Sequence, residues 1–88
     1  MHKASRTFWQ LYQALPHEIQ QTADKQFATL KANPNHLSVR FKKLAEKDGR
    51  EVWSARVTLK YRALAIKNGN IYDWFSIGEH GTYDFLIK

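Results

Sequence analysis

Two arginines stand on consecutive segments that the sequence predicts as β-strands, each on the polar side of its segment. Because successive side chains of a strand point to opposite faces, Arg56 shares a face with Ser54, and Trp53 points away from both. By the same parity Arg62 and Tyr61 point to opposite faces. A guanidinium group stays charged and binds phosphate oxygens through paired hydrogen bonds. The spacing therefore predicts a sheet with aromatic side chains on one face and a phosphate-binding surface on the other.

The positive charge of the chain is concentrated around these arginines. Residues 38–67 hold nine cations and three anions, which equals the net charge of +6 of the whole chain, so the remainder is neutral overall. Such asymmetry favours nucleic acid, an anionic surface or an acidic protein as partner. We interpret Lys42, Lys43 and Lys60 as a general electrostatic surface for RNA. Trp74 is a candidate for stacking on a base, and core packing is the alternative for it.

The length of 88 residues indicates one domain, residues 1–88, with a single core. The chain has no cysteine, no apolar segment behind its basic start, and no run near the roughly 20 apolar residues that cross a bilayer. These features predict a cytoplasmic protein without a membrane span. The histidines are scattered and no glycine-rich phosphate loop is present, so we expect neither a metal nor a cofactor.

The apolar spacing predicts two helices followed by a strand meander. Ser5 is placed to cap the first helix, which ends at Pro16, and the second helix spans residues 16–32. The predicted strands are residues 37–45, 51–59, 61–67 and 71–77, with turns at Asp48-Gly49 and Asn68-Gly69. We therefore expect an α+β fold in which two N-terminal antiparallel helices pack on one face of a twisted, mainly antiparallel sheet of three to four strands.

This order of elements and four short motifs resemble the RelE/ParE superfamily of toxins from bacterial type II toxin–antitoxin systems. The resemblance covers nearly the whole chain. The motifs are Phe41-Lys42-Lys43-Leu44, Trp53-Ser54-Ala55-Arg56, Tyr61-Arg62-Ala63-Leu64, and Trp74-Phe75-Ser76-Ile77-Gly78-Glu79-His80 with Tyr83. RelE-like toxins usually begin with a strand before the first helix, and residues 1–5 are too short and polar to predict one.

The resemblance implies a toxin held inactive by a cognate antitoxin protein, with two possible targets. RelE-like members cleave mRNA on the ribosome, whereas ParE-like members poison DNA gyrase. A non-catalytic module that binds RNA or an antitoxin is a third reading. The match implies Arg62 as a phosphate-stabilising cation, with Arg56 as the basic residue of the preceding strand. It also implies His80 and Tyr83 as the acid and the base.

These four residue types suit RNA cleavage without a metal. The reaction needs a base for the 2′-hydroxyl, cations for the phosphorane, and an acid for the departing 5′-oxygen. Each residue also has a structural alternative: an ion pair between Arg62 and Asp73, a solvated strand arginine at Arg56, a loop histidine at His80, and a packing tyrosine at Tyr83. At Ser54 the best-studied RelE-like toxins carry a lysine, so the expected cation cluster is thinner here.

Overall fold

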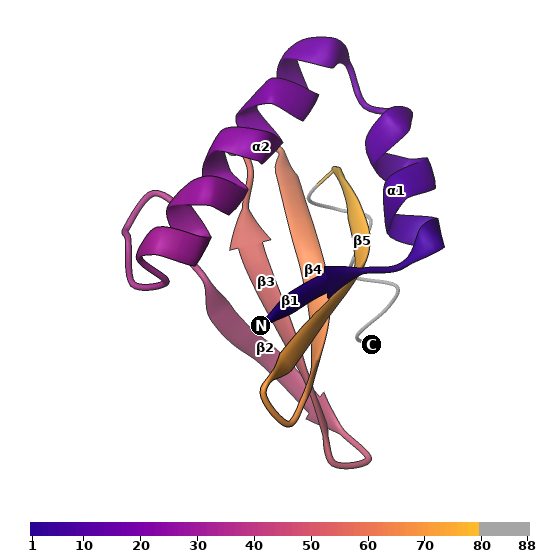
Figure 1. Cartoon of the computed structure of the whole chain (residues 1–88), viewed down its shortest axis with the longest axis vertical. Coiled ribbons are helices and arrows are strands. Elements are labelled where there is room, and N and C mark those ends of the chain that lie inside the picture. The colour runs from indigo at the N-terminus through magenta and orange to yellow at the C-terminus, as the bar shows by residue number, and fades with distance from the viewer. Residues whose placement is uncertain (80–88) are drawn as a thin grey trace.

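Two helices lie over one face of a five-stranded sheet in the computed structural model, which describes residues 1–79 apart from the side chain of Lys47 (Figure 1). The elements are β1 (His2–Ala4), α1 (Arg6–Gln13), α2 (His17–Ala32), β2 (Lys42–Lys47), β3 (Arg50–Arg56), β4 (Tyr61–Asn68) and β5 (Ile71–Glu79). The strand order is β1-β5-β4-β3-β2. No helix in this part of the chain has the length and apolar character needed to cross a bilayer.

The predicted boundary residues flank both helices, although α1 ends at Gln13, before the predicted end at Pro16. The Ser5 side chain accepts a hydrogen bond of 3.2 Å from the backbone N–H of Phe8, which satisfies one of the free donors at the start of α1. Pro16 precedes α2, and Asn33 closes that helix by donating its N–H to the carbonyl of Thr29. The helices splay apart from the short turn that joins them (Figure 1).

Replacing Ser5 with alanine should destabilise the fold by about 1 kcal/mol, because the Phe8 N–H would lose its acceptor. Urea unfolding followed by circular dichroism measures this change. Ser5→Asp is the matched control, since an aspartate at the same position also caps a helix. An alanine variant as stable as the wild type would show that α1 does not depend on this cap.

The hairpin between β2 and β3 has the turn that its sequence predicts. Asp48 and Gly49 form a two-residue loop with φ angles of 55° and 78°, and the type I′ turn requires positive φ at both positions. The hairpin between β4 and β5 differs by one residue from the prediction. Asn68 stays in β4, paired with Ile71, and Gly69 takes the first loop position with a φ of 58°, as a type II′ turn requires.

The strand β1 was not predicted, so the expected sheet of three to four strands is too small by this edge strand. Its three residues pair in parallel with β5, in register His2 with Tyr72 and Ala4 with Trp74. Backbone hydrogen bonds from Tyr72 to the Met1 carbonyl and from Ser5 to the Trp74 carbonyl hold it there. A strand of three residues is too short to show an alternating pattern, so no periodicity predicts it.

Two predicted strands are shorter than expected because turns interrupt them. Residues 37–41 were predicted as strand, yet Arg40 has a φ of 46°, in the left-handed region, and β2 begins only at Lys42. Residues 57–59 were also predicted as strand. They form the tight connection to β4 instead, in which the hydroxyl of Thr58 accepts hydrogen bonds from the N–H groups of Lys60 and Tyr61.

The core lies between the helices and the sheet. Its most deeply buried members are Leu30 of α2, with 1% of its surface exposed, and Ala65 of β4, with none. Side chains from α1 and α2 pack there against β3, β4 and β5. The other face of the sheet is the one that carries Arg56 and Arg62, so the core and the candidate phosphate surface lie on opposite sides, as strand parity predicts.

Candidate phosphate-binding site

The two arginines lie directly opposite each other on neighbouring antiparallel strands. Arg56 is the last residue of β3, and its register partner on β4 is Arg62. The connection between them is short, and backbone hydrogen bonds from Val57 and Thr58 to the Tyr61 carbonyl hold it in place. Like charges in directly opposed positions repel each other and destabilise a sheet. The fold thus brings together two cations that would gain from an anion between them.

Buried polar atoms without partners mark the same place. The Nε atom of Arg56, the Nε and Nη1 atoms of Arg62 and the Oγ atom of Ser54 are buried, and none has a hydrogen-bond partner in the part of the chain that the structure describes. Ser54 and Leu64 lie next to the arginines on the same face of the sheet and are almost fully buried. A buried donor without an acceptor costs about 1–3 kcal/mol, and more when it is charged. An anion would supply the missing acceptors.

Arg62 does not form the ion pair with Asp73 that was its structural alternative. Asp73 lies opposite Ile66 on β4, whereas the register partner of Arg62 on β5 is Gly78. The Asp73 carboxylate instead lies 3.9 Å from the Nζ atom of Lys3, on β1. Within the described residues, therefore, no acidic side chain pairs with Arg62.

The three lysines predicted to bind RNA lie in three different environments. Lys42 lies opposite Ser54 and so shares the face of the arginines. Lys43 lies on the other face and makes a 3.0 Å ion pair with Glu46, whose hydrogen bond raises the pKa of the Lys43 ammonium group. Lys60 is exposed in the connection between β3 and β4. Lys42 is thus the lysine that extends the arginine pair across the sheet.

Trp74, proposed from sequence to stack on RNA, lies in the core. It is 3% exposed, and its indole N–H donates a 3.0 Å hydrogen bond to Nδ1 of His2. Because the helices cover this face, we leave Trp74 out of the RNA surface. His80 and Tyr83 lie outside the described residues, so their roles stay predictions.

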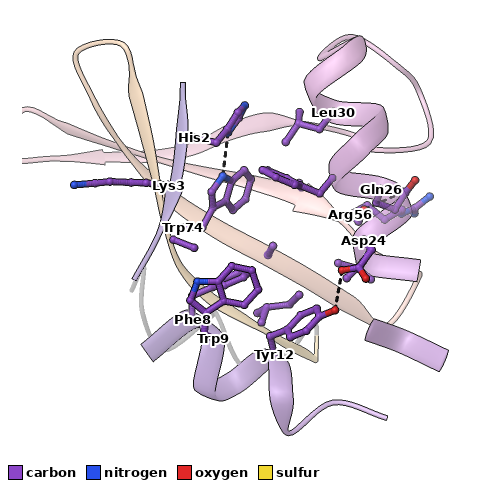
Figure 2. Close-up of a pocket in the computed structure, with 17 residues that line it drawn as sticks. His2, Lys3, Phe8, Trp9, Tyr12, Asp24, Gln26, Leu30, Arg56 and Trp74 are labelled. Atoms are coloured by element: carbon purple, nitrogen blue, oxygen red, sulfur yellow. Dashed lines mark hydrogen bonds between the residues drawn. The ribbon is translucent and has the colours of Figure 1, made fainter. Parts of the chain in front are cut away.

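A cavity of about 200 Å³ separates the helices from the sheet (Figure 2). Its walls are largely apolar and include Phe8, Leu30 and Trp74. At one side the hydroxyl of Tyr12 donates a 2.7 Å hydrogen bond to Asp24, which links α1 to α2 and raises the pKa of the tyrosine. Trp9 and Phe27 also line the cavity and stay partly exposed, at 49% and 38%. The molecule therefore offers an apolar recess on its helical side.

His2 lines another part of this cavity and is held by contacts with two aromatic side chains. Its Nδ1 atom accepts the Trp74 hydrogen bond (Figure 2). The ring also stacks against Tyr72, with centroids 5.4 Å apart. Burial lowers the pKa of His2 below its ordinary value of 6.5, and the charges of the N-terminal ammonium group and Lys31 lower it further.

The stability of the fold should consequently fall on acidification. An unfolded His2 takes up a proton near pH 6.5 more readily than the folded one, so the free energy of unfolding should decrease as the pH drops below 6.5. His2→Asn supplies an acceptor in place of Nδ1 and does not titrate, so the difference in stability between wild type and this variant should shrink or reverse from pH 7.5 to pH 5. His17→Asn is the control, because His17 is exposed on α2. Parallel pH curves for wild type and His2→Asn would contradict this assignment.

Gln26 is a polar residue near the arginines that was not predicted as part of the site. The side-chain amide of Gln26, on α2, donates hydrogen bonds to the carbonyl oxygens of Ser38 and Arg56, at 2.9 Å and 3.0 Å. Figure 2 shows Gln26 and Arg56 side by side at the edge of the cavity. The signal was present, since Gln26 follows Ala23 at a spacing of three and so interrupts the apolar stripe of its helix.

Comparison with known families identifies the class of this molecule. Residues 17–84 match the family described as the ParE-like toxin domain. The chain belongs to this family and is a toxin of the RelE/ParE superfamily, which confirms the resemblance stated from the sequence. No curated protein matches the sequence.

Three solved structures have the same fold. They are a chain of an archaeal RelE–RelB complex from Pyrococcus horikoshii OT3, a YoeB/ParE toxin from Agrobacterium tumefaciens, and a chain of the RelB–RelE antitoxin–toxin complex from Methanococcus jannaschii. Their TM-scores are 0.69, 0.65 and 0.64, each at 17% identity. The matches cover 91%, 90% and 93% of this chain and 93%, 96% and 95% of the others. The expected α+β architecture is thus confirmed.

Proposed function

We propose that this toxin is a ribosome-dependent mRNA endonuclease that arrests translation in the cytoplasm. The observation that carries the proposal is the pair formed by Arg56 and Arg62, whose buried guanidinium nitrogens lack partners among the described residues. Guanidinium groups whose nitrogens are partly removed from solvent interact more strongly with a phosphate than they would in water. They supply the charge stabilisation that a phosphorane needs, and no bound metal is part of the proposed chemistry.

The proton transfers are assigned to residues outside the described part of the chain. His80 is the proposed acid for the 5′-oxygen, because an imidazole has both protonation states accessible near neutral pH. Tyr83 is the proposed base, which requires nearby cations to lower its pKa. Glu79 is not assigned as the base. Its register partner is Tyr61, so the strand directs it to the face opposite Arg62.

The proposed protein partner is an antitoxin with apolar anchors and acidic side chains. Two of the similar structures are complexes of a RelE toxin with a RelB antitoxin, and the present chain has a net charge of +6 that an acidic segment complements. The cavity between the helices, with Trp9 and Phe27 partly exposed at it, suits an apolar side chain of such a segment. Ribosome and mRNA are the proposed targets of the free toxin.

Inhibition of DNA gyrase is the second candidate, because the matching family is named for ParE. Both functions use a basic surface, but a gyrase poison binds a protein and needs no phosphate in a buried arginine pair. The two readings therefore differ in what Arg62 does: it stabilises a transition state in one and contacts a protein surface in the other.

Induced expression in growing cells separates these functions. We expect wild type to arrest growth and to produce new mRNA 5′ ends within codons, seen by primer extension. Arg62→Ala should abolish both effects, whereas Lys25→Ala, which removes an exposed charge from α2, should leave them intact. Arrest with intact mRNA and trapped gyrase–DNA complexes would replace the ribonuclease proposal with the gyrase one.

A further inference from the structure

A cationic groove lies at the loop that joins α2 to β2, which is hydrogen-bonded to Arg56. This loop is drawn in magenta at the left of Figure 1. The groove is lined by Pro34, Asn35, His36, Leu37, Arg40, Phe41 and Lys42. Two of these side chains are cationic and none is acidic. Leu37 is 86% exposed at its rim, so the groove offers an apolar contact next to its charges.

The loop is fixed to the strand that carries Arg56. The backbone N–H of Arg56 donates a 2.6 Å hydrogen bond to the carbonyl of Val39, which is itself buried in the core. The amide of Gln26 donates to the Ser38 carbonyl and to the Arg56 carbonyl, so it joins loop and strand from the helix side. The N–H of Arg56 is thus bonded directly to the loop. Its carbonyl shares the Gln26 amide with the loop residue Ser38. The relative position of groove and arginine pair is set by these bonds.

Arg40 occupies a backbone conformation that arginine seldom adopts. Its φ of 46° costs on the order of 1–3 kcal/mol for a residue with a side chain, and the surrounding hydrogen bonds hold it there. It directly follows Val39, the residue bonded to Arg56. Glycine would take this conformation without strain. The arginine at this position therefore lowers the stability of the fold relative to a glycine.

His36 also lines this groove and is fixed there by a hydrogen bond. Its Nδ1 atom accepts a hydrogen bond of 3.2 Å from the backbone N–H of Ser38. Lys42, at the other end of the groove, lies opposite Ser54 on the arginine face. The cations thus continue from Arg62 and Arg56 through Lys42 to Arg40.

We propose that this groove is a second phosphate subsite, in which Arg40 binds the RNA backbone next to the phosphate held by Arg56 and Arg62. The proposal rests on the proposed function for its ligand, RNA, and adds a contact that the arginine pair does not make. Its role is binding rather than chemistry. Loss of Arg40 should weaken RNA binding uniformly across sequences, because a phosphate contact carries no sequence information.

The test measures binding of a 2′-O-methyl RNA oligonucleotide, which lacks the 2′-hydroxyl and therefore reports binding without cleavage. For single strands, each phosphate contact contributes about 0.7 to the slope of log affinity against log salt. Arg40→Gln should reduce the slope by about this amount. Arg40→Gly should do the same while fitting the backbone better. Lys25→Gln, with the same loss of charge on exposed α2, should leave the slope unchanged.

The outcomes for subsite and function can be told apart. If both Arg40 variants match Lys25→Gln in slope and affinity, or if wild type does not bind the oligonucleotide, the subsite is refuted. If the slope of log affinity against log salt is smaller in the Arg40 variants while wild type leaves ribosome-bound mRNA intact, the subsite stands and the ribonuclease proposal fails. Cleavage of mRNA with an unchanged slope at Arg40 would leave the ribonuclease proposal standing and remove the subsite.

Discussion

Replacing Arg62 with methionine should abolish RNA cleavage and at the same time make the protein more stable. Arg62 faces Arg56 across the strand pair, and its Nε and Nη1 atoms are buried without partners in the described residues. Removing one of two opposed like charges, together with its unsatisfied donors, should raise the free energy of unfolding by about 1 kcal/mol. Methionine retains much of the apolar stem of the side chain.

The loss of activity should be large because the lost interaction forms in the transition state. Removal of one oxyanion-stabilising donor typically costs about 100-fold to 1,000-fold in rate. Cleavage is followed on ribosome-bound mRNA with purified protein, and stability is followed by urea unfolding of the same samples. Arg50→Met is the matched control, since Arg50 is exposed at the start of β3. A methionine variant that is less stable than wild type would identify Arg62 as a structural residue, and the site would lose its main support.

Replacing Trp74 with alanine should cost about 3–5 kcal/mol of folding stability. This is a large share of the total, because a domain of this size has about 4–13 kcal/mol at 0.05–0.15 kcal/mol per residue. Trp74 is 3% exposed, contacts the aromatic ring of Phe27 edge-on and donates its indole N–H to His2. The substitution therefore removes core volume and the side-chain hydrogen bond that ties β1 to β5.

Two companion variants separate these contributions. Trp74→Phe keeps an aromatic ring but leaves His2 without its donor, so it should cost less than the alanine variant. Trp9→Ala removes the same side chain from a site that is 49% exposed, and it should cost least. Unfolding is best followed by far-ultraviolet circular dichroism, because the variants differ in tryptophan fluorescence. Equal losses for Trp74→Ala and Trp9→Ala would contradict the placement of Trp74 in the core.

The features predicted correctly from the sequence are those that depend on residues close together in the chain. Ser5 marks the start of α1 by a side-chain cap, and Asp48-Gly49 marks a turn because both positions need positive φ. Strand parity placed Arg56 and Arg62 on one face, opposite the core. These three results depend on contacts between residues that lie close together in the sequence.

The features that were missed depend on contacts between distant residues. The strand β1 exists because residues 2–4 meet β5 at the far end of the chain, and three residues carry no periodicity of their own. Gln26 joins α2 to Arg56, thirty residues away, so only the fold reveals the link. The strand predicted from residue 37 begins only after Arg40, because Arg40 has a φ of 46°, a conformation that the residue type does not predict.

The most direct test of the proposed function is a reconstituted translation assay with purified toxin. Stalled ribosomes carrying a defined mRNA are mixed with wild type or Arg62→Met, and the 5′ ends of the mRNA are mapped with and without ribosomes. A parallel sample tests DNA gyrase for trapped cleavage complexes. We predict cuts in the ribosome-bound mRNA that require Arg62, with gyrase unaffected. Intact mRNA together with trapped gyrase would contradict the proposal that this toxin cleaves mRNA through its arginine pair.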